Sequence, residues 1–514
     1  MIKLNYNFGF KWWKNKDVFV KGFLTDQDGK YCESEDLLEY FNNIDKYHEF
    51  KRKIKNANGL FSVIIKNGNN YFVAVDKLRT FPLFYYETKD EYIITDDTSI
   101  IQSEFNLSIN KISQDELLSS GYITDKYTMY NDLFQLQASE LIIFNNNDLV
   151  LNKEFYRSYA TNKVSSSSPE ELEKDFLNIL DNVSKRLIKS LNGRMALIPL
   201  SGGYDSRLVA TLLKKHNYSN VICFTYGNKN SFEVKISKEV AQKLGFKWFY
   251  VEYTQELIGY YVNTDTFNQY YKYAYNNTAC FLLQDYFAIQ YLKDNNLVNK
   301  DAIVITGHSG DLLAGSQLPL EIKYKSTNSK IVNKVMSQTY ALSKPKNYTL
   351  LKYRIYDNLT ENYAYSIVEN FFVNRKIARF IINSHRIYEF FGFEHRLPLW
   401  DDELTEFFRI LPYKYKSEPY FYEEVLLKTL FKVYDIDIVP PDKIGRNTFK
   451  AKIKRKLKKF TPKFIVDFRE KLLFENINNV DFISAPLIKD CNNKIENSIH
   501  IDKIIVKWLL NKSS

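Results

Sequence analysis

The segment "LIPLSGGYDSRLVATLL", residues 197–213, decides the fold of the longer part of the chain. It begins as a short apolar strand, turns at Gly202 and Gly203, and continues as a helix that starts near Asp205. Such a turn leaves free backbone N–H groups at the start of the helix, where an anion is favoured. Paired glycines let phosphate oxygens approach the backbone, and Asp205 offers a carboxylate to a phosphate-bound Mg²⁺. A tight turn that Asp205 merely caps is the alternative, because the loop lacks the lysine of a Walker loop.

Three fully apolar strand candidates lie in this part of the chain: "MALIPL" (195–200), "NVICFTY" (220–226) and "DAIVITG" (301–307). Helical patterns follow the first two, over residues 205–215 and 231–244. Strands that alternate with helices in this way predict a parallel sheet with right-handed crossovers.

The N-terminal part has a different pattern. Short alternating segments such as "GLFSVIIK" (59–66), "NNYFVAVD" (69–76) and "FPLFYYE" (81–87) are separated by turn residues, which predicts an antiparallel sheet. We therefore expect two domains.

A helix start marks the expected boundary between them. In "VSSSSPEELEKDF" (164–176), Ser167 or Ser168 can cap a helix whose first position is Pro169. The predicted domains are residues 1–160 and 169–514.

Bulk composition excludes several classes of protein. The chain of 514 residues is 45% hydrophobic and 26% charged, which is typical of a soluble protein with two or three cores. Its four cysteines form no CxxC pair, which argues against a structural zinc site and a disulfide scaffold. We find neither the apolar stretch of a signal peptide nor a run of about 18 apolar residues, and so expect a cytoplasmic protein.

The S-G-G-x-D-S loop resembles the pyrophosphate-binding loop of N-type ATP pyrophosphatases, and three other segments narrow the resemblance to the asparagine synthetase family. "TGHSGDLLAG" (306–315) is similar to the second ATP-site loop of that family, with Asp311 as a second metal-binding residue. "GFEHRLPLWDDEL" (392–404) is similar to its G-x-E-x-R-x-P-x-x-D segment. Residues 58–97 resemble the last hairpins of its glutaminase domain, through Gly59, Phe61, Asp76, Arg79, Pro82, Leu83 and Tyr85.

This resemblance implies a two-domain α/β fold. A degenerate αββα sandwich of the N-terminal-nucleophile hydrolase type would precede an ATP pyrophosphatase domain of the HUP-like type with added helices. The second domain would contain a five-stranded parallel sheet, with the ATP cleft at the carboxyl ends of its strands.

The resemblance also implies a reaction and its cofactors, ATP and Mg²⁺. A substrate carboxylate would attack the α-phosphorus of ATP and release pyrophosphate, and an amine would then displace AMP. Asp205 and Asp311 would hold the metal. The ATP-binding residues would be Leu200, Ser201, Gly202, Gly203, Asp205, Ser206, Tyr226, Thr306 and Gly307. Tyr226 is expected to contribute through its backbone amide.

The chain departs from the glutamine-hydrolysing members of this family. Their nucleophile is a cysteine that follows the removed Met1, whereas residue 2 here is Ile. The expected glutamine-binding Asn-Gly stretch reads "VKGFLTDQDG" (20–29). We therefore predict a glutaminase-inactive member, similar in organisation to β-lactam and carbapenam synthetases.

Three further side chains are candidate catalytic residues. His308 stands where asparagine synthetases carry Glu and β-lactam synthetases Tyr, and a neutral imidazole can take a proton from an amine; a histidine that only packs the loop is the alternative. Glu394 either orients His308 or the amine, while Arg396 faces a carboxylate, or forms an ion pair with Arg396 that shapes the cleft. Lys443 in "PPDKIGR" (440–446) matches a lysine that stabilises the adenylation transition state.

Residues 443–463 carry ten basic residues and no acidic one, with apolar residues at helical spacing. A basic amphipathic helix on an anionic inner membrane face is one interpretation; an acidic polymer, tRNA or a solvated helix are others. We expect small-molecule carboxylate and amine substrates, with an acidic sugar of a surface polysaccharide as a candidate, and no nucleic acid. Secondary-metabolite synthesis, a macrocyclase of the same family and a catalytically inactive scaffold protein are the alternatives. The stretch 316–380 is expected to shape the substrate pocket.

Overall fold

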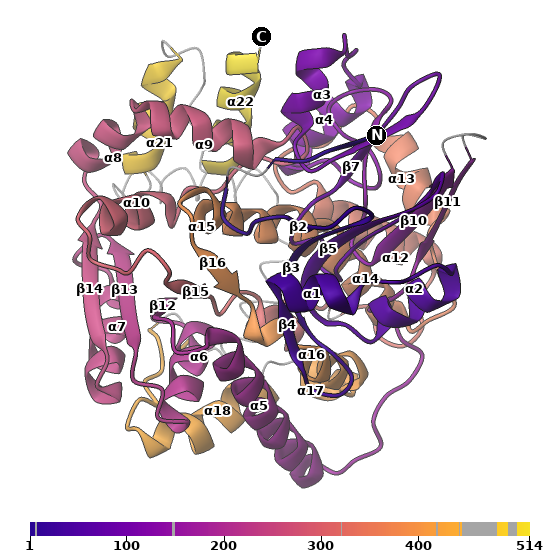
Figure 1. Cartoon of the computed structure of the whole chain (residues 1–514). Helices are drawn as coiled ribbons and strands as arrows, with labels where there is room; N and C mark the ends of the chain where they lie inside the picture. Colours follow the sequence, from indigo (N-terminus) through magenta and orange to yellow (C-terminus); the bar gives the residue numbers. More distant parts are fainter. Residues whose placement is uncertain are drawn as a thin grey trace.

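The computed structural model describes residues 1–5, 8–145, 150–319, 321–417, 420–441, 443–444, 481–491 and 501–513. Within these residues the chain forms three sheets. A five-stranded sheet occupies one side of the molecule, and two further sheets formed by the N-terminal part occupy the other (Figure 1).

The five-stranded sheet is parallel throughout. Its order is β14, β13, β12, β15, β16, and every neighbouring pair runs in the same direction. The strands are β12 (Ala196–Pro199), β13 (Val221–Gly227), β14 (Lys247–Glu252), β15 (Ile303–Ile305) and β16 (Glu394–Arg396). The predicted parallel sheet is thus confirmed, and β12, β13 and β15 are the three strands that the apolar runs predicted.

Side chains alternate between the two faces of this sheet along each strand, so both faces carry apolar side chains that must be covered. Ile198 and Ile305 belong to the core on one face, whereas Leu197 and Val304 belong to the core on the other. All four side chains are fully buried, and each such burial stabilises the fold by about 1.5–3 kcal/mol.

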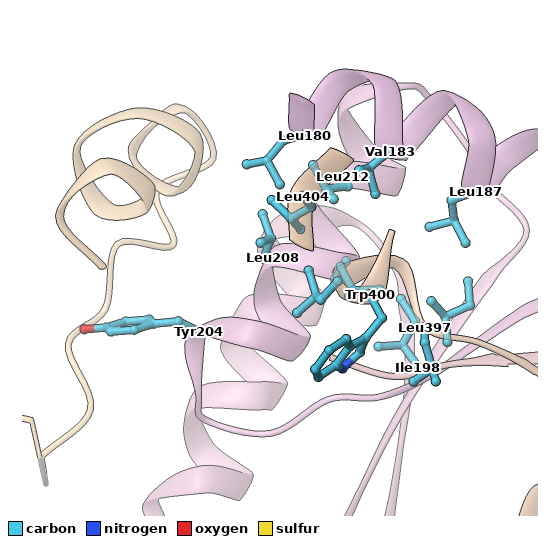
Figure 2. Packing of buried hydrophobic residues seen from close by; sticks show 14 of the residues in the cluster. Leu180, Val183, Leu187, Ile198, Tyr204, Leu208, Leu212, Leu397, Trp400 and Leu404 are labelled. Carbon is cyan, nitrogen blue, oxygen red and sulfur yellow. The ribbon is translucent and has the colours of Figure 1, made fainter. Parts of the chain in front are cut away.

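The first face is covered by α5 (Pro169–Leu191), α6 (Tyr204–Lys215) and α7 (Phe232–Leu244). Figure 2 shows leucines of α5 and α6 packed around Ile198, with Leu397 and Trp400 closing the cluster from the segment after β16. The second face is covered by α8 (Gln255–Val262), α9 (Asp265–Tyr275), α10 (Tyr286–Asp294), α21 (Asp481–Asp490) and α22 (Ile501–Ser513).

Helix α5 begins where the sequence predicted. Ser168 and Glu171 form a reciprocal capping box, in which the Glu171 amide donates to Ser168 Oγ and Glu171 Oε2 accepts from the Ser168 amide. Pro169 occupies the first helical position. The domain boundaries at 160 and 169 themselves stay a prediction.

We expect Ser168→Ala to weaken the first turn of α5 by about 1 kcal/mol, because one backbone donor loses its acceptor. Hydrogen exchange followed by mass spectrometry checks this: amides in residues 169–176 should exchange roughly fivefold faster. Unchanged exchange in that peptide would show that the cap contributes nothing.

The N-terminal part contains a seven-stranded and a four-stranded sheet. The larger sheet comprises β2 (Trp13–Lys14), β3 (Val18–Thr25), β4 (Tyr31–Glu33), β5 (Asn58–Asn67), β6 (Asn70–Val75), β10 (Glu140–Asn145) and β11 (Val150–Phe155). The smaller sheet comprises β1 (Ile2–Lys3), β7 (Phe84–Glu87), β8 (Tyr92–Thr95) and β9 (Leu133–Gln135). The larger sheet is antiparallel, as expected.

The smaller sheet departs from the prediction at its edge, because β1 pairs with β8 in parallel. Two apolar side chains explain the position of β1: Ile2 and Leu4 pack into the core between the two sheets.

Helices complete a four-layer arrangement in this part of the chain. The larger sheet packs on α1 (Ser34–Tyr40) and α2 (Tyr47–Lys55), and the smaller sheet packs on α3 (Thr98–Glu104). Helix α4 (Lys111–Ser120) follows. A relation to N-terminal-nucleophile hydrolases stays a prediction.

The stretch 316–380 is mostly helical and has a core of its own. It contains α12 (Asn328–Thr339), α13 (Tyr348–Tyr356), α14 (Ala364–Phe372) and a π-helical segment, Val373–Ile381. A 3₁₀ turn (Ile382–His385) and α15 (Arg386–Phe390) lead from it to β16.

The segment after β16 supplies short helices around the carboxyl edge of the sheet. These are a 3₁₀ turn (Pro398–Trp400), α16 (Asp402–Ile410), α17 (Tyr413–Lys416), α18 (Tyr420–Leu426) and a π-helical turn (Leu427–Phe431). Within the described ranges, no helix combines the length and the apolar character that a membrane span requires. The basic segment lies outside the described residues from 445 onward, so the amphipathic helix stays a prediction.

Candidate active site

The first loop, residues 201–206, connects β12 to α6 at the carboxyl edge of the sheet. The Ser201 amide donates to Ser206 Oγ at 3.1 Å, the two serine hydroxyls lie 3.0 Å apart, and the Gly203 amide donates to Ser201 Oγ at 3.2 Å. The hydroxyls of Ser201 and Ser206 thus hold the loop together. Gly203 gives α6 no side-chain cap, so the start of the helix keeps backbone N–H groups for an anion.

A buried arginine of α6 is hydrogen-bonded to the backbone of this loop. Arg207 donates to the Gly202 carbonyl at 2.9 Å and to the carbonyls of Ile436 and Ile438 at 2.8 and 2.7 Å. It thereby fixes the chain that leads toward Lys443 against the start of α6.

The second loop, residues 306–311, packs directly on the first. It follows β15 and runs into α11 (Gly310–Leu313). A Cβ at Gly307 would lie 2.4 Å from the Ser206 nitrogen, and one at Gly310 would lie 2.8 Å from Asp205 Cγ. Both positions therefore need glycine for the two loops to touch.

This contact brings the two predicted metal-binding carboxylates together. The Asp311 amide donates to Asp205 Oδ2 at 3.0 Å, across 106 residues of sequence. Burial and the Asp311 carboxylate raise the pKa of Asp205 well above its ordinary value. A divalent cation would relieve that unfavourable charge.

These oxygen ligands fit Mg²⁺, which is commonly held by one or two carboxylates together with substrate phosphates. Within the described residues no group of three or more His, Cys, Asp or Glu forms a closed metal site. A metal at this pair would therefore need further oxygen ligands, which a bound phosphate can supply.

Sequence reasoning missed a tyrosine at this pair. Tyr422 of α18 is 2% exposed, and its hydroxyl donates to Asp205 Oδ1 at 2.9 Å. The aromatic residues next to Tyr422 in the sequence do not mark it as a site residue, because aromatic residues are frequent throughout the chain.

Lys443, the candidate for stabilising the adenylation transition state, lies near the first loop. Its Nζ is 4.0 Å from the ring centroid of Tyr204, the first residue of α6, and 2.6 Å from Glu423 Oε1. Figure 2 shows the Tyr204 ring pointing away from the cluster around Trp400. The lysine is thus held beside the start of α6.

His308 lies in the second loop, and its partner was not foreseen. His308 Nδ1 is 3.1 Å from Nε2 of His385, which also lies 2.9 Å from Thr306 Oγ1. Burial lowers the pKa of His308. A neutral imidazole therefore stands in the loop that carries Asp311.

Glu394 does not reach His308 in this structure. It pairs with Arg396 at 2.9 Å and with Arg194 at 3.1 Å. Glu394 is level with Ile303 in the register of β15 and β16, well before the carboxyl edge where the loops lie. The ion-pair interpretation fits these contacts, whereas the orienting role for Glu394 does not.

Two of the expected ATP-binding residues, Leu200 and Tyr226, form hydrogen bonds within the protein itself. The Leu200 amide donates to the Phe224 carbonyl at 2.8 Å, and the Leu200 carbonyl accepts from Thr225 Oγ1 at 2.6 Å. The Tyr226 hydroxyl donates to Asp285, which also accepts from the Tyr388 hydroxyl. The hydroxyl of Tyr226 is therefore already hydrogen-bonded within the protein, and the backbone role expected for this residue stays a prediction.

A cavity of about 440 Å³ lies between the N-terminal part and α16. Its basic side chains are already paired: Lys77 and Arg157 with Asp402, and Arg409 with Glu406. Because these positive charges are neutralised by carboxylates of the protein, the charge of the cavity does not identify a class of ligand. Among the described residues, its lining includes neither loop.

Residues 194–493 match the family model described as asparagine synthase, which is more than half of the 514 residues. The chain belongs to the asparagine synthase family. The match contains both loops and the segment from Glu394 to Asp401, so the resemblance inferred from the sequence is confirmed at the level of the family.

Among curated proteins, the asparagine synthase family member is similar to the putative asparagine synthetase [glutamine-hydrolyzing] 2 of Methanocaldococcus jannaschii, with 24% identity over 187 residues. That match covers 35% of this chain and 36% of the relative, so the chain spans about a third of the length of the relative it matches.

Solved structures are only distantly similar. The glutamine phosphoribosylpyrophosphate amidotransferase of B. subtilis is 11% identical, with a TM-score of 0.20 over 47% of this chain and 72% of that one. The NH₃-dependent NAD synthetase of Campylobacter jejuni is 16% identical, with a TM-score of 0.21 over 41% and 94%. The glutamine-dependent NAD⁺ synthetase of Acinetobacter baumannii is 12% identical, with a TM-score of 0.21 over 68% and 70%. Scores of this size carry no inference about this chain.

Proposed function

We propose that this family member is an ATP-dependent amide ligase that adenylates a substrate carboxylate and transfers the acyl group to an amine without using glutamine. One observation carries the proposal: two glycine-tight loops bring Asp205 and Asp311 together at the uncapped start of α6. A phosphate chain and its magnesium ion need this combination of N–H groups and carboxylates.

In the first half-reaction, a carboxylate oxygen attacks the α-phosphorus of ATP and the bond from that phosphorus to the bridging oxygen breaks. Pyrophosphate leaves from the N–H groups at the start of α6. When bound by Asp205 and Asp311, Mg²⁺ would supply charge neutralisation on the phosphate oxygens. Lys443 is the proposed source of positive charge for the transition state, and its position beside Tyr204 at the start of α6 supports that role.

In the second half-reaction, the amine nitrogen attacks the acyl carbon and the bond from that carbon to the AMP oxygen breaks. The amine must lose a proton as the C–N bond forms. His308, neutral and in the second loop, is the proposed acceptor.

The burial of the cysteine side chains supports the proposal that the reaction does not use glutamine, because glutamine hydrolysis in this family needs a reactive thiol. All four cysteines of the sequence are buried. Burial raises the pKa of Cys32, Cys223 and Cys280, which keeps these thiols protonated and unreactive. Residue 2, where glutaminase members carry their nucleophile, is an isoleucine that packs against the core between two sheets.

We propose small-molecule carboxylate and amine substrates, with an acidic sugar as one candidate. The basic residues 443–463 favour this class, because such a segment can approach an anionic membrane face where lipid-linked sugars are built. A binding or scaffold protein is the second candidate, favoured by the eroded resemblance of the N-terminal part.

The test is Mg²⁺-dependent exchange of labelled pyrophosphate into ATP, measured with a panel of amino acids, uronic acids and nucleotide-linked uronic acids. We expect exchange that requires one carboxylate class and is unaffected by glutamine. ATP cleavage to ADP and phosphate would contradict adenylation, and ATP binding without exchange for any carboxylate would favour the scaffold protein.

A further inference from the structure

We propose that His385 is a positioning residue that fixes the tautomer of His308, so that Nδ1 of His308 carries the proton and Nε2 is left as the proton acceptor. The inference rests on the proposed function only where it assigns that acceptor to the amine. The tautomer itself follows from three contacts of His385, with the Ile382 carbonyl, Thr306 Oγ1 and His308 Nδ1.

The first contact sets the protonation of His385. Its Nδ1 lies 3.1 Å from the carbonyl oxygen of Ile382, within the same 3₁₀ turn. A carbonyl oxygen can only accept, so Nδ1 of His385 must carry a hydrogen.

Burial then determines whether the other ring nitrogen of His385, Nε2, carries a proton. The side chain is 1% exposed. Burial, followed by the neighbouring imidazoles of His308 and His395, holds its pKa well below the usual range. His385 is therefore neutral, and its Nε2 is a lone pair that can only accept.

Two groups face that lone pair: Thr306 Oγ1 at 2.9 Å and His308 Nδ1 at 3.1 Å. A bare Nδ1 would set two lone pairs against each other, so Nδ1 of His308 is protonated and shares the acceptor with the threonine hydroxyl. The rings cross at 77° with centroids 4.7 Å apart.

It follows that Nε2 of neutral His308 has no hydrogen. Within the described chain no hydrogen bond involves this atom. It is the basic atom of the second loop, available to an incoming amine.

The surroundings allow this atom to take and return a proton. Burial lowers the pKa of His308, Asp285 opposes that shift, and His395 adds to it. Asp285 is held by the hydroxyls of Tyr226 and Tyr388, and His395 faces Glu389. When the amine N–H bond breaks, Nε2 takes the proton and the imidazolium keeps its Nδ1–H bond to His385. Water takes the proton after the product leaves.

The experiment is nitrogen-15 NMR of the full chain with labelled histidine, which shows directly which ring nitrogen is protonated. The sequence contains only six histidines, so His308→Ala identifies the signal of His308. In the wild type we expect His308 to be protonated at Nδ1. Protonation at Nε2 would overturn the proposal without any variant.

Two substitutions at His385 form a matched pair. In His385→Gln the amide oxygen can still accept from His308, so Nδ1 protonation should persist. In His385→Phe the acceptor is lost, and the His308 signal should move toward Nε2 protonation. An unchanged tautomer in a folded His385→Phe protein would overturn the assignment.

Kinetics separate positioning from mere structure. His385→Phe should slow the amine-dependent step at least about tenfold more than it slows pyrophosphate exchange, and His385→Gln should recover most of that loss. Equal losses in both steps would overturn the role at the amine. If the wild type shows no exchange, the proposed function fails. The NMR measurement still tests the tautomer of His308, because it does not depend on activity.

Discussion

Asp205→Asn is expected to lower the rate of Mg²⁺-dependent pyrophosphate exchange by at least about 100-fold, equivalent to about 2.7 kcal/mol of transition-state stabilisation. Asp311→Ala should have an effect of similar size. The Asp311 amide donates to Asp205 Oδ2 at 3.0 Å, so both residues lie at the same point between the two loops, and we expect them to act on the same ion. Exchange assays on the purified variants measure both losses.

The thermal midpoint of the metal-free protein is the control for folding. Burial and repulsion by Asp311 make the Asp205 carboxylate unfavourable in the folded chain, as its raised pKa shows. Asparagine can keep both contacts, because its oxygen can accept from the Asp311 amide while its NH₂ group donates to the Tyr422 hydroxyl. It also removes the charge, so Asp205→Asn should melt no lower than the wild type above about pH 4, where the unfolded carboxyl is ionised. A stable variant with unchanged exchange would contradict the metal assignment.

Gly307→Ala is expected to disrupt the site by geometry rather than by charge. The added Cβ would lie 2.4 Å from the Ser206 nitrogen and 2.5 Å from the Asp205 carbonyl carbon, and neither backbone atom can move aside. Overpacking of this kind typically costs about 1–3 kcal/mol. We expect ATP to bind at least about tenfold more weakly, which is about 1.4 kcal/mol, and the melting temperature to fall.

Gly259→Ala is the matched control. Gly259 lies in α8, and a Cβ there would meet no atom within 4 Å. Because alanine favours a helix over glycine, this change should stabilise slightly, by up to about 1 kcal/mol, and leave ATP binding unchanged. Equal ATP affinity in both variants would show that the two loops need not touch.

The proximity of Asp205 and Asp311 was predictable from the sequence, because it depends on local pattern and topology. Asp205 and Asp311 each follow a strongly apolar run that can only be a buried strand. Strands β12 and β15 are parallel neighbours, so their carboxyl ends and the loops that follow share one edge. The two aspartates meet although 106 residues separate them.

Strands β14 and β16 were not predicted, for physical reasons. Strand β14, "KWFYVE", lies at the sheet edge with mostly half-buried or exposed side chains, so it lacks the apolar run of a central parallel strand. Strand β16 has only three residues, "EHR", two of which pair with each other. Tertiary contacts determine the positions of β14 and β16 in the sheet, and such contacts produce no periodic pattern in the sequence.

The partners of the site residues were equally hidden. His385 is the last residue of a 3₁₀ turn that follows a π-helical segment. The spacing of both differs from that of an α-helix, so the direction of the His385 side chain could not be derived from the sequence. Tyr422 reaches Asp205 across 217 residues through the packing of α18. Glu394, by contrast, was foreseen both as an orienting residue and as an ion-pair partner of Arg396, and the register of β16 favours the second.

The central claim is that the two loops form a binding site for the phosphates of ATP. Isothermal titration calorimetry with ATP and Mg²⁺ tests it most directly, because it requires no knowledge of the substrates. We predict that the wild type binds ATP in a Mg²⁺-dependent manner and that Asp205→Asn and Gly307→Ala weaken binding while Gly259→Ala does not. A wild-type protein that fails to bind ATP, or three variants that bind it equally well, would contradict the account.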